Sequence, residues 1–219
     1  MTADPPPVTV PPPSDPFDAE TETLASAAAL YRVGSNRRPI DQFNPGIGSP
    51  TRFAFFGDPV IPVLYAADTP EAALAESLLH DIPLSGGNLV FDTYAQAVMG
   101  RLIVVPELRL ASLCGLGPRR LGVEARQRTD TDTDTDTDTD EYPRTVAWAK
   151  AAHDNGFDGL SWTSRRCNDA RAVVLFGDRC VDALVQDTEF GRLFENGLGL
   201  DWLIDTCAPL RVDVLPPTQ

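Results

Sequence analysis

The stretch 63–79 reads VLYAADTPEAALAESLL, and it predicts a short buried strand that runs directly into a helix. The apolar run at its start has the length and composition of a strand. Thr69 is a good N-cap residue, Pro70 suits the first helical position, and Glu71 lies at the positive end of the helix dipole. The alanines and leucines that follow favour a helix that continues to His80.

Glu76 is the charged residue on the second turn of this predicted helix, and its helical neighbours are alanines and leucines. A carboxylate that leans into such an apolar face is either a functional group with a shifted pKa or the buried partner of an arginine. The third interpretation is a glutamate that faces solvent. The spacing by itself leaves all three open.

The remaining elements mix strands and helices without a regular β-α-β alternation. Strands are predicted at residues 30–34, 52–56, 60–66, 101–105, 108–113, 157–162, 172–176 and 183–185, and helices at 70–80, 142–153 and 188–204. Proline, glycine and asparagine make residues 35–50 a long loop. This pattern predicts an α+β domain with a mixed, mostly antiparallel β core and flanking helices.

Changes in composition mark the ends of the predicted domain. Residues 1–22 are rich in proline and acidic side chains, which predicts a disordered tail. A single domain is expected over residues 23–210, followed by a C-terminal tail at 211–219. Six consecutive Thr-Asp dipeptides at 129–140 carry like charges without an apolar face, so we expect a solvated acidic loop there.

Charge and metal-binding residues argue against several classes of function. The 219-residue chain has a formal net charge of −14, which disfavours direct binding to nucleic acid. Its four cysteines form no Cys-x-x-Cys pair and it has two histidines, so we expect no metal site. Because the sequence shows no membrane-spanning run and no secretory signal, we expect a cytoplasmic protein without membrane association.

Six short motifs, taken in order, resemble the RES domain, a family named for an arginine, a glutamate and a serine. The motifs are Leu30–Val33, Thr51–Phe53, Leu64–Asp68, Ala73–Glu76, Gly159–Arg165 and Ala172–Phe176, and the similarity extends over about residues 29 to 186. RES proteins are bacterial NAD-consuming enzymes, and many are the toxins of toxin–antitoxin pairs. The resemblance therefore implies a fold similar to that of ADP-ribosyltransferases.

The resemblance also implies cleavage of the nicotinamide–ribose bond of NAD, with phosphate or water as acceptor. NAD would be a substrate and not a bound cofactor, and phosphate a candidate co-substrate. The expected catalytic residues are Glu76, which would stabilise a ribosyl cation, Arg32, and Ser164, which would orient the substrate. The expected substrate-binding residues are Arg52, Tyr65 and Arg165, which would contact phosphates and base.

Simpler structural roles stay open for several of these residues. Arg32 and Glu76 could form a structural ion pair. Tyr65 could be a tyrosine at the edge of the core with a satisfied hydroxyl. His80 is expected to end the helix, and Phe53 stands where the family often has tryptophan.

The resemblance to the RES domain also has implications for partners and for rival functions. The resemblance implies an antitoxin with a helix-turn-helix domain that covers the active site, and the sequence is compatible with a homo-oligomer. One rival is an ADP-ribosyltransferase that modifies a macromolecule. The other is a non-catalytic interaction module, in which Glu76 would affect stability alone.

Overall fold

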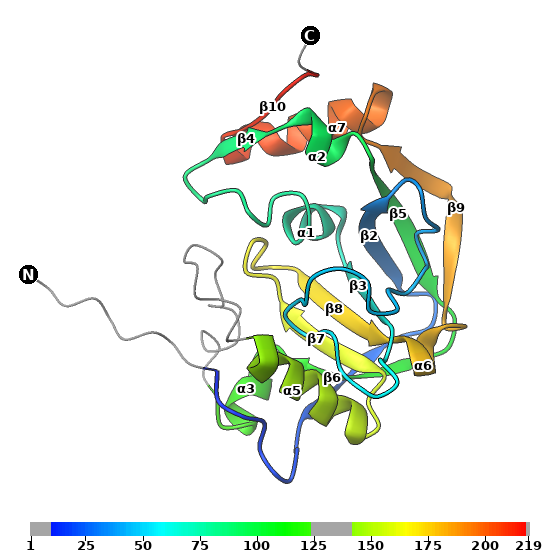
Figure 1. Cartoon of the computed structure of the whole chain (residues 1–219), viewed down its shortest axis with the longest axis vertical. Coiled ribbons are helices and arrows are strands. Elements are labelled where there is room, and N and C mark those ends of the chain that lie inside the picture. Colours follow the sequence, from blue (N-terminus) through cyan, green and yellow to red (C-terminus); the bar gives the residue numbers. More distant parts are fainter. Residues whose placement is uncertain (1–9, 124–141, 218–219) are drawn as a thin grey trace, which may run out of the picture.

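The computed structural model describes residues 10–123 and 142–217, and its centre is an eight-stranded sheet (Figure 1). The strands are β1 Glu20–Leu24, β2 Ala29–Ser35, β3 Val63–Ala67, β5 Ala97–Val104, β6 Leu108–Leu113, β7 Gly159–Thr163, β8 Arg171–Phe176 and β9 Leu184–Leu193. They lie in the order β1-β6-β7-β8-β3-β2-β5-β9. All neighbours are antiparallel except β6 and β7, so the predicted mostly antiparallel α+β fold is confirmed.

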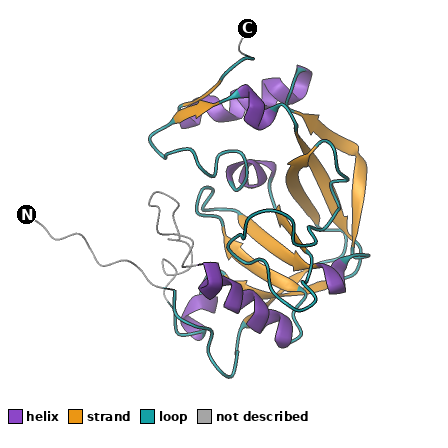
Figure 2. Ribbon diagram, viewed as in Figure 1, coloured by secondary structure: helices purple, strands orange, loops and turns teal. Residues whose placement is uncertain are grey.

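Helices lie on both sides of this sheet and at one end of it (Figure 2). They are α1 Pro70–Ala75, α2 Phe91–Tyr94, α3 Gly117–Arg120, α5 Tyr142–Asp154, α6 Gly177–Cys180, α7 Gly197–Cys207 and the 3-10 turn η2 Ala208–Leu210. Two short parallel strands, β4 Gly87–Leu89 and β10 Val212–Val214, pair beside α7. Within the described residues, every helix is too short or too polar to cross a lipid bilayer.

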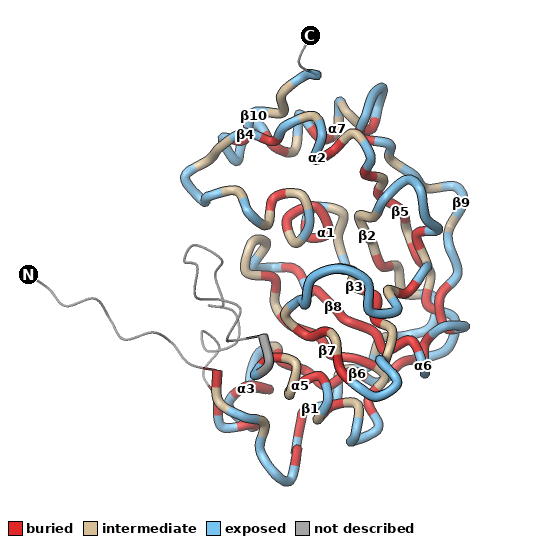
Figure 3. Tube along the Cα trace, viewed as in Figure 1, coloured by how far each residue is buried: buried red, intermediate tan, exposed pale blue. Residues whose placement is uncertain are grey.

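The central strands are apolar on both faces because both faces are covered. In β8, Val174 and Phe176 pack into one cluster with Trp148 of α5, whereas Val173 and Leu175 pack into a second cluster on the other face. This alternation is the two-residue period of a strand. Figure 3 shows the buried residues concentrated along β3, β7 and β8.

The sheet nearly parts between β2 and β3. These strands pair only at Tyr31 and Ala67, although β2 pairs with β5 over seven positions and β3 with β8 over five. Beyond this one position the two halves of the sheet lose contact through their backbones. The parting leaves room for side chains to line a cavity between the halves.

The helix after β3 is shorter than the sequence predicts. Thr69 caps it as expected, accepting a hydrogen bond from the backbone N–H of Ala72 at 3.2 Å. The helix nevertheless ends at Ala75 instead of continuing to His80. The Ser77 hydroxyl donates to the carbonyl of Ala73, and such a bond competes with continuation of the helix.

The predicted disordered tail at 1–22 is wrong for residues 10–22, whereas residues 1–9 lie outside the described part of the chain. Val10 and Phe17 are buried, and the Phe17 ring lies edge-on to Trp148 with ring centres 6.0 Å apart. The indole N–H of Trp148 donates to the carbonyl of Pro11 at 2.9 Å. A few apolar residues are enough to dock this segment, because α5 presents an apolar surface against which they can pack.

The structure also corrects the prediction at three other places. Residues 188–193 belong to β9, so the predicted helix at 188–204 forms only from Gly197 onwards. Residues 212–214 form β10 and pair with β4, although we expected a tail at 211–219. Residues 52–56 form a turn with buried side chains in place of a strand. The Thr-Asp run at 129–140 lies outside the described residues.

We expect the Gly159→Ala substitution in β7 to lower the free energy of unfolding by about 3 kcal/mol or more. A Cβ atom at this position would lie 2.2 Å from the backbone carbonyl oxygen of Val174, which cannot move without breaking the sheet. The matched control is Gly191→Ala in β9, where a Cβ meets no atom within 4 Å and the expected change is under about 0.5 kcal/mol. Urea denaturation measures both, and equal effects would contradict the close approach of β7 to β8.

Candidate active site

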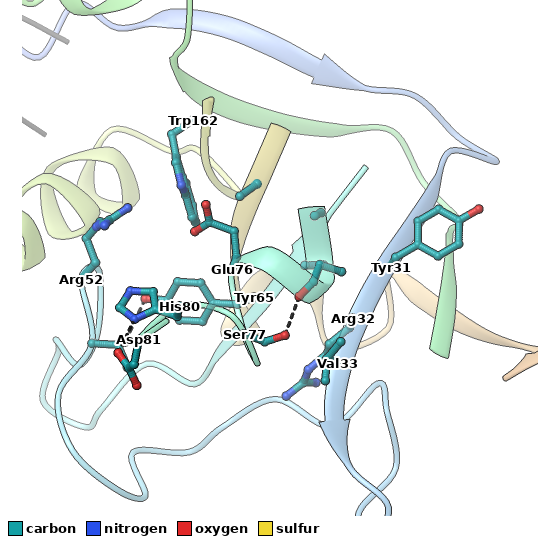
Figure 4. Close-up of a pocket in the computed structure, with 15 residues that line it drawn as sticks. Tyr31, Arg32, Val33, Arg52, Tyr65, Glu76, Ser77, His80, Asp81 and Trp162 are labelled. Carbon is teal, nitrogen blue, oxygen red and sulfur yellow. Dashed lines mark hydrogen bonds and ion pairs between the residues drawn. The ribbon is translucent and has the colours of Figure 1, made fainter. Parts of the chain in front are cut away.

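A cavity of about 370 Å³ opens where β2 and β3 part, and we call it the central cavity (Figure 4). Its walls come from β2, the loop before β3, β3 itself, the end of α1, and strands β7 and β8. The residues that line it are Tyr31, Arg32, Val33, Thr51, Arg52, Tyr65, Ala66, Ala67, Ala73, Glu76, Ser77, His80, Asp81, Trp162 and Ala172. Four predicted site residues are therefore together: Arg32, Arg52, Tyr65 and Glu76.

Small side chains make the floor of the central cavity. Trp162 lies opposite Ala172 in the sheet, Ala172 lies opposite Ala67, and Ala67 lies opposite Tyr31. Residues directly opposite one another on neighbouring strands are close. Two alanines between two aromatic residues thus leave a trough in the sheet, and Glu76 at the end of α1 stands beside it.

Ser164 holds the carboxylate of Glu76 in place. Its hydroxyl donates to Oε1 of Glu76 at 2.6 Å and accepts the backbone N–H of Cys167 at 3.0 Å. Ser164 is 1% exposed and does not line the central cavity, so it lies behind Glu76. This position differs from the direct substrate contact that we expected from the sequence: Ser164 can act on a bound molecule through Glu76.

Arg32 is fixed by the loop that follows β2. Its Nη1 donates to the carbonyl oxygens of Ile40 and Gln42, both at 2.8 Å. Burial lowers the pKa of the Arg32 guanidinium from its ordinary value, and the nearby Asp41 carboxylate acts in the opposite direction. No ion pair of the described residues joins Arg32 to Glu76, and in Figure 4 the arginine points away from it.

Tyr65 connects the loop that carries Arg52 to β3. Its hydroxyl shares a 2.9 Å hydrogen bond with the Thr51 hydroxyl and accepts the backbone N–H of Phe53 at 3.1 Å. The alternative of a satisfied tyrosine at the edge of the core is therefore correct in part, because the ring also lines the central cavity. Tyr65 keeps residues 51–53, and with them Arg52, against the cavity.

Trp162 is a site residue that sequence reasoning missed. Its ring lies 5.0 Å from that of Phe53 and 6.2 Å from that of Tyr65, measured between ring centres. Its indole N–H is buried and has no acceptor among the described residues. Its place in the cavity follows from its pairing opposite Ala172, which the sequence does not show.

His80 and Asp81 were also missed as site residues, because His80 was expected only to end the predicted helix at 70–80. Nδ1 of His80 lies 2.8 Å from Oδ1 of Asp81, and both residues line the central cavity. Arg166 donates to the carbonyls of His80 and Ile82 and so braces this turn. Arg165, the predicted phosphate contact, is half-buried next to Arg166 and is not among the lining residues.

The side chains of the central cavity combine two kinds of chemistry. A positioned carboxylate can stabilise a cation that develops nearby, and arginines can bind an anionic group of the same molecule. A thiol nucleophile is disfavoured at the adjacent turn, because burial, aided by Asp169, raises the pKa of Cys167 to about 11. In the described part of the chain, no cluster of three or more His, Cys, Asp or Glu side chains is placed to hold a metal ion.

Comparisons with known proteins identify the family and the fold of the chain. The family model described as the RES domain matches residues 29–194. Among solved structures, the chain is similar to one in the crystal structure of the M. tuberculosis MbcT–MbcA toxin–antitoxin complex, with a TM-score of 0.51 and 15% identity. That match covers 77% of this chain and 85% of the other, and it shows a shared fold. No curated protein matches the sequence significantly.

We expect Tyr65→Phe to lower the free energy of unfolding by about 1–2 kcal/mol, because it leaves the Phe53 N–H and the Thr51 hydroxyl without their partner. Thr51→Val removes one of the same bonds, so the two substitutions should be clearly non-additive in urea denaturation. Additive effects would contradict the link between Tyr65 and the loop.

Proposed function

This chain belongs to the RES domain family, and on that premise we propose that it degrades NAD as the toxin of a toxin–antitoxin pair. The proposed reaction cleaves the nicotinamide–ribose bond, with phosphate or water as the acceptor. The observation that carries the proposal is the Glu76 carboxylate, which Ser164 holds at a cavity that two arginines also line.

The proposed chemistry needs little more than a well-placed negative charge. Nicotinamide leaves as a neutral molecule, so no general acid is required at its nitrogen. The ribose that remains has the character of an oxocarbenium ion, as in glycoside hydrolysis. Glu76 would stabilise this cation, and Ser164 would act as a positioning residue by keeping the carboxylate in one orientation.

Arg32 and Arg52 would bind the anionic part of the substrate. Arginine suits a diphosphate because its guanidinium is planar, permanently charged and rich in donors. Two carbonyl oxygens hold Nη1 of Arg32, which leaves its other N–H groups to a ligand. Such fixed donors bind without first losing the freedom of a mobile side chain.

The aromatic wall would receive the nicotinamide or its ribose. Tyr65 and Trp162 offer ring surface against which a flat heterocycle can pack. Buried polar groups normally have partners, so the free indole N–H of Trp162 suggests that a ligand oxygen completes its hydrogen bond. We propose Trp162 as a substrate contact on that basis.

An antitoxin is the proposed protein partner. Support comes from the shared fold with a chain of the MbcT–MbcA toxin–antitoxin complex. We propose that the partner carries a helix-turn-helix domain, as the family resemblance implies.

The wild-type protein should release nicotinamide from NAD, and Glu76→Gln should slow this release by at least about a hundredfold. Glutamine keeps the shape and an acceptor for Ser164 but lacks the negative charge. The matched control is Glu71→Gln, which removes an exposed charge from the first turn of the same helix and should leave the rate unchanged. Chromatography with and without phosphate measures nicotinamide and identifies the ribosyl product.

Three results would count against the proposal as stated. Folded wild-type protein that releases no nicotinamide at millimolar NAD would exclude the enzyme. Release that depends on an added protein or nucleic acid, which itself becomes modified, would indicate an ADP-ribosyltransferase. Growth arrest on expression that persists with Glu76→Gln would separate the toxicity from NAD cleavage.

Trp162→Phe should raise the KM for NAD about tenfold, because it removes the proposed N–H donor. The smaller ring also leaves a gap against Phe53 and Tyr65, so some loss of thermal stability is expected. Trp202→Phe on α7 is the control for a tryptophan outside the central cavity. Steady-state nicotinamide release and thermal melting provide the two measurements. A large loss of stability with an unchanged KM would show that Trp162 only packs the core.

A further inference from the structure

A second cavity of about 340 Å³ adjoins the first, and we call it the loop cavity. Its lining comes from the end of β2 and the segment after it: Arg32, Gly34, Ser35, Arg37, Arg38, Pro39, Ile40, Gln42, Phe43 and Asn44, together with Gln96, which directly precedes β5. The Asp41 carboxylate, which acts on Arg32, is not among the lining residues. Arg32 lines both cavities, so the loop cavity lies on the other side of this side chain from the central cavity.

The loop cavity is positively charged in a strongly acidic protein. Arg32, Arg37 and Arg38 line it, and none of its described lining residues carries a carboxylate. Within residues 10–123 and 142–217, no ion pair or side-chain hydrogen bond engages the guanidinium of Arg37 or Arg38. The chain as a whole has a net charge of −14 and could readily supply counter-charges, so two adjacent unpaired arginines on a cavity wall are an uncommon arrangement here.

The segment that carries these arginines is held in place before any ligand binds. The side chain of Ile40 is buried, and it fits because Gly34 and Gly100 lack side chains: a Cβ at either glycine would lie within about 3 Å of it. The N–H of Asn36 donates to the carbonyl of Gln96 at 2.8 Å. The backbone on both sides of Arg37 and Arg38 is therefore anchored to β2 and β5.

The carbonyls that fix Arg32 belong to the same segment, since they come from Ile40 and Gln42. The Arg32 side chain and the backbone that carries Arg37 and Arg38 are thus held together. An unoccupied group of this kind attracts an oxyanion, and arginine is the side chain best suited to phosphate oxygens. A small neutral or cationic ligand would gain nothing from it.

We propose that the loop cavity is a phosphate-binding subsite in which Arg37 and Arg38 bind a phosphate group next to Arg32. This inference rests on the proposed function, in which the central cavity binds the nicotinamide–ribose end of NAD. The loop cavity would then hold a phosphate group beside that end. The phosphate is either the diphosphate of the dinucleotide or free phosphate that serves as acceptor. Both sources offer the same oxyanion to the arginines.

The test is calorimetric binding of ADP-ribose and of inorganic phosphate to the full-length protein near 0.15 M salt, where long-range attraction is screened. The affinity for each ligand is measured for three proteins. They are the wild type, the double variant Arg37→Gln/Arg38→Gln and the control double variant Arg119→Gln/Arg144→Gln. The control removes the same charge from exposed positions on α3 and α5, outside both cavities. All of these arginines are exposed, so thermal melting should differ little among the three proteins.

We expect the double variant in the loop to weaken binding of at least one ligand about tenfold, while the control changes it less than twofold. Weaker ADP-ribose binding assigns the subsite to the diphosphate of the substrate. Weaker binding of inorganic phosphate alone assigns it to the acceptor. Unchanged binding of both ligands, equal weakening in the control, or no binding to the wild type at millimolar ligand would overturn the proposal.

Nicotinamide release by the same proteins separates this inference from the proposed function. Wild-type protein that releases nicotinamide but binds both ligands without help from Arg37 and Arg38 would leave the enzyme in place and remove the subsite. Wild-type protein that binds phosphate through these arginines without releasing nicotinamide would remove the enzyme and keep the subsite.

Discussion

The constraint on which the site depends is the single backbone contact between β2 and β3, at Tyr31 and Ala67. A sheet that remained paired along its length would leave no space between these strands. Because the halves separate, side chains from four strands, a loop and the end of a helix can face a common cavity. The alanines at positions 67 and 172 deepen it, since a larger side chain at either position would fill the trough.

Rigid elements then hold the functional groups on the loops around this opening. Glu76 lies at the end of a short helix and depends on Ser164 from the turn between β7 and β8. Arg52 depends on Tyr65 of β3, and the turn at His80 depends on Arg166. For Glu76 and for the turn at His80 the anchor lies more than 80 residues away in the sequence, so the geometry of the site depends on the whole fold. This is the usual way in which a stable scaffold positions variable loops.

Local chemistry made part of the structure predictable. The cap at Thr69 and Pro70 located the start of α1, and apolar runs located β2, β3, β6, β7 and β8 to within a few residues. Four residues chosen from the ordered motifs line one cavity: Arg32, Arg52, Tyr65 and Glu76. What the sequence could not supply were features decided by distant partners. The buried place of Ser164 and the packing of Phe17 on Trp148 both depend on contacts between remote segments.

The docked segment at residues 10–24 precedes the part of the chain that the family model matches, and its partners lie late in the sequence. Its Glu22 carboxylate accepts a hydrogen bond from the hydroxyl of Ser161, 139 residues further on, and β1 needs β6 to pair. On the ribosome this segment therefore emerges before its partners, and it lacks the full set of them until β7 has been made. Closing so long a loop is entropically costly, which makes docking of β1 a late step in folding. The edge of the sheet at β6 is thus exposed to other strands for as long as that step takes.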